Sequence, residues 1–205
     1  MSRLTSLSPA ALKAMFSPDA DDTLMSLLTL TGSGIVQPVR LVDNYTHRFE
    51  YLNGTQMTVT VIATNVSSTF TYASTDAIIK DAINSDIDNP IYGTISNSRP
   101  FIFLPYNLTL PTEEQAAAPR CSITINDVSR LMIPILRPLQ APPLVSISLV
   151  LSNTPDAVEV NFPDFLMGGI SYNASSITAE LTVESLATEP FPSGTFTQSN
   201  FQGLF

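Results

Sequence analysis

This chain of 205 residues contains one cysteine, one histidine and no tryptophan. The lone Cys121 excludes a disulfide within the chain, because a disulfide needs two cysteines. Zinc sites take three or four Cys and His ligands as a rule, and His47 and Cys121 do not supply them. A serine or cysteine triad would need His47 as its base, yet no Gly-x-Ser-x-Gly motif occurs. We therefore predict no catalytic, metal or cofactor site.

Charge and long hydrophobic runs are also scarce. Charged residues make up 13% of the chain, and nine basic residues against eighteen acidic ones give a net charge of −9. This balance argues against direct binding of nucleic acid, which requires clustered Lys and Arg. No run approaches the eighteen or so consecutive apolar residues of a membrane span, and no secretory signal is recognisable. We expect synthesis in the cytoplasm.

Apolar residues make up 44% of the chain, and their spacing is that of β-strands. Leu24–Thr31 is apolar on both faces, which is typical of a central strand, and Asn53-Gly54 indicates a hairpin turn. Apolar and polar residues alternate over residues 57–61, 121–125, 145–151 and 177–183. We predict an all-β fold, mainly an antiparallel sandwich or barrel, with two or three short helices.

The helices are expected near the beginning and the middle of the chain. Ser8 followed by Pro9 predicts a capped helix that ends near Phe16. Asn126 predicts the start of a second short helix, which Pro134 ends or kinks.

Three segments follow from these patterns: an N-terminal helical arm at 1–21, a β domain at 22–188 and an extended C-terminal arm at 189–205. Within the β domain the pattern weakens from Val66 to Arg99, and we expect an insertion at about 66–99. A helix over Asp76–Ile87, with loop around it, is our prediction for this insertion.

The C-terminal arm carries the predicted partner-binding residues Phe191, Phe196, Phe201, Leu204 and Phe205. The spacing of its phenylalanines fits neither a helix face nor a strand face. Burying four of them returns roughly 6–12 kcal/mol, whereas fixing the arm's backbone costs on the order of 17–34 kcal/mol. We therefore expect backbone pairing and a neighbouring surface to hold the arm, either on its own domain or on another subunit.

Four segments resemble a family of tailed-bacteriophage proteins of unknown function, encoded near the tape-measure and tail-tip genes. They are Leu24–Leu41, Arg120–Val128, Pro142–Val160 and Glu189–Phe205, within a similarity covering most of residues 22–205. The resemblance implies a minor tail or tail-tip protein, similar in role to distal-tail proteins, that belongs to the virion tail. It implies a ring joining the tail tube to the hub, with tail-tube, hub or tape-measure proteins as neighbours. No catalytic residues come with it.

Two other interpretations remain open. A glycan-binding β-sandwich of a phage or an adhesin would need an aromatic-lined groove, and the lack of tryptophan counts against it. A hydrolase would need two carboxylates that face each other, which sequence spacing does not reveal. The acidic clusters Asp19/Asp21/Asp22 and Asp86/Asp88 lack the glycine and distal glutamate of an EF-hand, and we interpret them as solvated loops.

Overall fold

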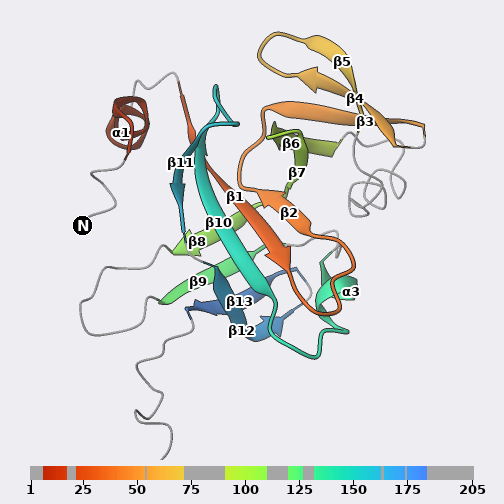
Figure 1. Cartoon of the computed structure of the whole chain (residues 1–205), viewed down its shortest axis with the longest axis vertical. Helices are drawn as coiled ribbons and strands as arrows, with labels where there is room; N and C mark the ends of the chain where they lie inside the picture. The colour runs from red at the N-terminus through yellow and green to blue at the C-terminus, as the bar shows by residue number, and fades with distance from the viewer. Residues whose placement is uncertain are drawn as a thin grey trace, which may run out of the picture.

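Strand β1 (Leu24–Thr31) lies in the middle of a large sheet, between β2 and β10. The computed structural model describes residues 7–17, 22–53, 55–71, 91–109, 120–126, 132–162, 164–173 and 175–183. Within these ranges, one mixed, mainly antiparallel 13-stranded sheet is accompanied by two short helices (Figure 1). The predicted all-β fold with two or three short helices is confirmed.

The helices are α1 (Pro9–Phe16) and α3 (Ile133–Leu136). The other strands are β2 (Val39–Val42), β3 (His47–Asn53), β4 (Gln56–Val61), β5 (Val66–Thr71), β6 (Ile91–Ser96), β7 (Arg99–Phe103), β8 (Tyr106–Thr109), β9 (Arg120–Ile125), β10 (Leu144–Leu151), β11 (Val158–Asn161), β12 (Phe165–Tyr172) and β13 (Ile177–Thr182).

Seven strands form a ring that strand pairing leaves open at β8. β2, β1, β10, β12, β13, β9 and β8 pair in that order, each antiparallel to the next. Only Leu104 and Pro105 separate β8 from β7, and β7 pairs with β2 in parallel, with Leu41 opposite Ile102. The hydrogen bond from Tyr106 on β8 to Ser26 on β1 brings β8 back against β1, so these strands curl around one interior. We call this part of the sheet the barrel, although within the described residues no strand pairing closes it.

Alternating apolar side chains from every strand of the ring fill the barrel interior. Each buried Leu, Ile, Val, Met or Phe contributes roughly 1.5–3 kcal/mol, so this cluster is the main source of stability. Its buried members on the ring strands and on the chain joining β7 to β8 are Leu28, Leu30, Val39, Leu41, Leu104, Cys121, Ile123, Ile125, Val145, Ile147, Leu149, Phe165, Met167, Ile177, Ala179 and Leu181.

The opposite face of β1 is buried as well. Met25 and Leu27 pack with Val42, Phe101 and Val150 in a separate apolar cluster outside the barrel. β1 is therefore apolar on both faces because protein covers both, and the prediction of a central strand is confirmed.

Strands β6, β3, β4 and β5 continue the sheet beyond β7, and we name these four strands the extension (Figure 1). β3 and β4 form the antiparallel hairpin predicted from Asn53-Gly54, with Asn53 opposite Gln56. One face of the extension holds a small buried cluster of Phe49, Met57 and Val59 together with Ile102.

Gly93 lets β6 lie against its neighbours in this cluster. A Cβ at this position would stand 2.1 Å from the backbone oxygen of Phe101 and 2.5 Å from a ring carbon of Phe49. Any larger residue would push β6 away from β7, so glycine is required by close approach.

Helix α1 begins as predicted, with Ser8 as its N-cap and Pro9 in its first turn. The Ser8 hydroxyl oxygen accepts a hydrogen bond from the Ala11 amide at 3.1 Å. The amide and hydroxyl of Ser8 donate to the carboxylate of Glu159 on β11, at 3.0 and 2.8 Å. The same residue therefore caps the helix and attaches it to the sheet.

Three strands were not predicted. β5 and β6 lie in the stretch 66–99, so the loop prediction is wrong for residues 66–71 and 91–96. β12 was not recognised as a strand because it contains Gly168-Gly169. At this point its pairing with β13 shifts register, and Gly169 has a φ of 57°. A bulge of this kind interrupts the alternation by which a strand is recognised. The helix predicted over Asp76–Ile87 lies outside the described residues.

Pro134 belongs to the first turn of α3 and does not end a helix. A proline is well placed there, because the first turn of a helix has no use for its missing N–H. Residues 127–131, where we predict a helix after Asn126, lie outside the described residues.

Candidate functional site

The predicted partner-binding residues fall in the C-terminal arm, and the structure describes the chain only as far as residue 183. All five predicted residues therefore lie outside the described part of the chain: Phe191, Phe196, Phe201, Leu204 and Phe205. The described residues do contain two candidate interaction surfaces and one polar cluster, and sequence patterns pointed to none of them.

The first candidate surface is the outer face of the extension, opposite its apolar cluster. Strand register places the side chains of this face on the same side of the sheet: Arg48, Glu50, Thr58, Thr60, Ser67, Thr69 and Tyr92.

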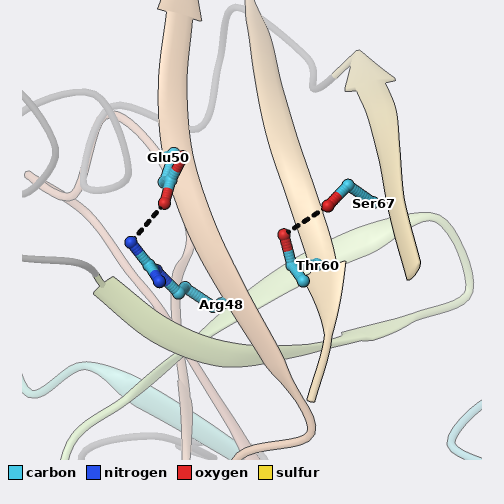
Figure 2. A network of polar contacts seen from close by, with 4 residues as sticks. All are labelled: Arg48, Glu50, Thr60 and Ser67. Atoms are coloured by element: carbon cyan, nitrogen blue, oxygen red, sulfur yellow. Dashed lines mark hydrogen bonds and ion pairs between the residues drawn. The ribbon is translucent and has the colours of Figure 1, made fainter. Parts of the chain in front are cut away.

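Two polar contacts lie on the outer face: one along β3 and one between β4 and β5 (Figure 2). Arg48 Nη2 lies 2.5 Å from Glu50 Oε1, and Thr60 Oγ1 lies 3.0 Å from Ser67 Oγ. An exposed ion pair of this kind contributes only about 0.2–1 kcal/mol, so its two side chains are held weakly. Their charges and the neighbouring hydroxyls are accessible to a binding partner.

Two exposed tyrosines contact each other here: Tyr92 lies on this face, and Tyr45 lies beside it. The ring centroid of Tyr45 is 4.9 Å from that of Tyr92 and 4.9 Å from that of Phe103. Tyr45 is 42% exposed and Tyr92 is 36% exposed. Large, ordered aromatic rings with polar ends are common at binding surfaces. Sequence analysis missed them because Tyr45 lies between strands and Tyr92 lies in a strand that we did not predict.

The second candidate surface is the free edge of β5. This strand stands at the end of the strand order and pairs, within the described residues, only with β4. Five of its six residues are exposed, and its sequence Val-Ser-Ser-Thr-Phe-Thr contains no charge and no proline. Natural edge strands are commonly protected by Lys, Pro or a bulge, and β5 has none of these in its six residues.

The polar cluster consists of Ser26, Asp43 and Tyr106, at the place where β8 lies against β1. The amide and hydroxyl of Ser26 donate to the Asp43 carboxylate at 2.9 and 2.5 Å. The Tyr106 hydroxyl donates to the backbone oxygen of Ser26 at 2.7 Å and lies 2.9 Å from its Oγ. These contacts join β1, the end of β2 and β8.

Burial governs the protonation of this cluster. It raises the pKa of Asp43 above its ordinary value, against the hydrogen bonds from Ser26 that lower it. It also raises the pKa of Tyr106, as does the nearby Asp43 carboxylate, so the phenol keeps its proton and donates a hydrogen bond. The adjoining cavity has a volume of about 200 Å³, below the roughly 300–1,000 Å³ of ligand pockets. Mutually satisfied polar groups beside so small a space are typical of a structural network.

His47 and Cys121 lie apart from this cluster. Thr46 Oγ1 lies 2.7 Å from His47 Nδ1, and burial lowers the pKa of this histidine. Cys121 is buried in the barrel interior, and burial raises the pKa of its thiol to about 11. Its burial agrees with the alternation of apolar and polar residues predicted over residues 121–125.

Within the described ranges, no three His, Cys, Asp or Glu residues gather in a group that could hold a metal ion. Of the predicted acidic clusters, only Asp22 is described, and the rest lie outside: Asp19, Asp21, Asp86 and Asp88. The helices of the described part are too short to span a membrane.

Comparison with known proteins gives no relative from which a function could be transferred. No protein family, no curated protein and no solved structure matches this chain.

Proposed function

We propose that this protein is a structural subunit of a tailed-phage virion, a tail-tip or distal-tail-like protein. Its copies assemble into a ring that joins the tail tube to the hub, and the ring binds neighbouring tail-tube, hub or tape-measure proteins. The resemblance of its strand segments and of its C-terminal arm to phage tail proteins supports this role.

The edge of β5, which within the described residues pairs only with β4, is the observation that carries the proposal. Alternate residues of an edge strand direct their backbone N–H and C=O groups away from the sheet, where another strand can pair with them. A closed ring is built from heterologous contacts repeated around an axis, and strand addition is one form of such a contact. The uncharged sequence of β5 leaves this pairing unopposed.

The test is the oligomeric state of the full-length protein, measured by size-exclusion chromatography with light scattering, together with mass spectrometry of intact particles. We expect a closed oligomer in solution and the protein in purified virions. A strictly monomeric protein that is absent from the particles would refute the proposal.

A glycan-binding module is the second candidate, and the Tyr45–Tyr92 pair favours it. Exposed aromatic rings beside Arg48 and Glu50 offer both a stacking surface and hydrogen-bonding groups, in place of the missing tryptophan. Tyr92→Ala should abolish binding on a glycan array, while Tyr172→Ala should not. Tyr172 is the matched control, because it is 47% exposed but lies on β12. An array without signal for the unaltered protein removes this candidate.

A further inference from the structure

The extension ends on the edge strand β5, and three residues of this strand occur again in the C-terminal arm. β5 ends Thr69-Phe70-Thr71, and the arm contains Thr195-Phe196-Thr197. We propose that the segment Thr195–Ser199 of a neighbouring copy pairs with β5 as an added strand. This inference rests on the proposed self-assembly and names the surface and the segment that make it.

The side chains of β5 show how such a strand would be received. Phe70 is half-buried and packs against the apolar cluster of the extension, whereas Thr69 and Thr71 are exposed on its outer face. Val66 lies on the same face as Phe70 and is 60% exposed. Within the described residues, no strand lies beside it at the unpaired edge of β5. An added strand would cover Val66 and lengthen the apolar face by one position.

The arm has the alternation that this position requires. With the arm antiparallel to β5 and Phe196 opposite Phe70, Thr197 faces Thr69 and Thr195 faces Thr71 on the polar outer face, because side chains alternate along a strand. No charged residue follows Glu189, so nothing in the arm repels the uncharged edge. Aromatic and β-branched side chains on adjacent strands form favourable cross-strand pairs.

The described part of the sheet has two other edge strands, which are less suited to receive an added strand. β8 lies against β1, to which the Tyr106 hydroxyl binds. β11 carries Glu159, whose carboxylate accepts two hydrogen bonds from Ser8. Within the described residues, the unpaired edge of β5 has no comparable contact with another element.

The position of β13 favours donation between copies. β13 precedes the arm and pairs with β9 and β12 in the barrel, and it lies toward the other end of the long axis from β5 (Figure 1). An arm that leaves one molecule near β13 and reaches β5 of the next links the two head to tail. This is the heterologous contact that a ring requires.

Disulfide trapping in the full-length protein tests the inference. Two differently tagged chains are mixed under oxidising conditions, one carrying Thr69→Cys and the other Thr197→Cys. We expect a disulfide between the two chains, because both side chains lie on the outer face. Ser68→Cys is the matched control: it lies one residue away and is exposed, but its side chain is on the opposite face. Its yield should be at least about tenfold lower, since a disulfide needs nearby, converging Cβ atoms.

Charge substitution gives an independent measurement on the same surface. Thr69→Lys should weaken self-association by about tenfold or more, because charged edge strands resist pairing. Combining it with Thr197→Glu should restore association through an opposite-charge pair across the two strands.

Each other outcome overturns the inference in a distinguishable way. A disulfide within one chain that carries both cysteines, without one between chains, makes the arm an intramolecular strap. Dimers of Thr69→Cys alone assign the edge to a second β5. An oligomer that gives no disulfide between Thr69→Cys and Thr197→Cys, and whose association is unchanged by Thr69→Lys, refutes this contact but leaves the proposed function standing. A protein that is monomeric throughout refutes both.

Discussion

Replacing Tyr106 with phenylalanine tests whether the Ser26–Asp43–Tyr106 cluster holds the barrel closed. The substitution removes one hydroxyl and keeps the ring. The lost contacts are the 2.7 Å bond to the backbone oxygen of Ser26 and the 2.9 Å contact with its Oγ. Ser26 is 6% exposed, so water does not readily replace them.

The expected cost follows from these contacts. Leaving a buried polar group without its partner costs about 1–3 kcal/mol. The Ser26 oxygen keeps a weaker contact with the Asp43 amide at 3.4 Å, which places the expected loss in unfolding free energy near 2 kcal/mol. For a chain of this size that corresponds to a fall in Tm of about 4–8 °C.

Urea unfolding followed by circular dichroism measures the change, and Tyr172→Phe on β12 is the control. Tyr172 is 47% exposed, so removing its hydroxyl should change stability by less than about 0.5 kcal/mol. The midpoint of Tyr106→Phe should fall with an unchanged m-value. Equal midpoints for the two variants would show that the cluster does not stabilise the barrel.

Three further predictions follow from the packing and the buried groups. Gly93→Ala should destabilise the fold by about 3 kcal/mol or more in urea unfolding, because its Cβ would meet the Phe101 backbone oxygen at 2.1 Å. Gly168→Ala, which meets no atom within 4 Å, is its control, and equal costs would contradict the stated contact. Burial raises the pKa of Asp43 above 3.8, so stability falls as pH rises from that value through the folded pKa. Asp43→Asn should flatten this part of a pH series of unfolding curves, and an unchanged slope would contradict it. Cys121, whose pKa is raised to about 11, should react with thiol reagents only after unfolding, and rapid labelling of the native protein would refute its burial.

The strands that pack on one face or on both were predictable from sequence. Alternation identified the strand at 121–125, where Cys121, Ile123 and Ile125 line the barrel interior. Continuous apolarity identified β1, because protein covers both of its faces. In each case the side-chain pattern records a tertiary environment, so the environment could be inferred from the pattern.

Strands without a regular apolar pattern were not predictable. β5 is exposed over most of its length, so its sequence carries no alternation, and β12 contains the bulge at Gly168-Gly169. The Ser26–Asp43–Tyr106 cluster joins residues far apart in sequence, and Tyr45 meets Tyr92 only because β6 pairs with β3. Such contacts are set by topology, which local spacing does not encode.

The order of the strands along the chain determines which part of the sheet can form first. The hairpins of the extension join neighbours in the chain, so β3, β4 and β5 are able to associate early during synthesis. The barrel, by contrast, stays open until β13 has been made, because β9 has no other partner than β13 on that side. Until then the interior leucines and isoleucines face water, and a nascent chain stalled before residue 177 would be a half-built, aggregation-prone intermediate.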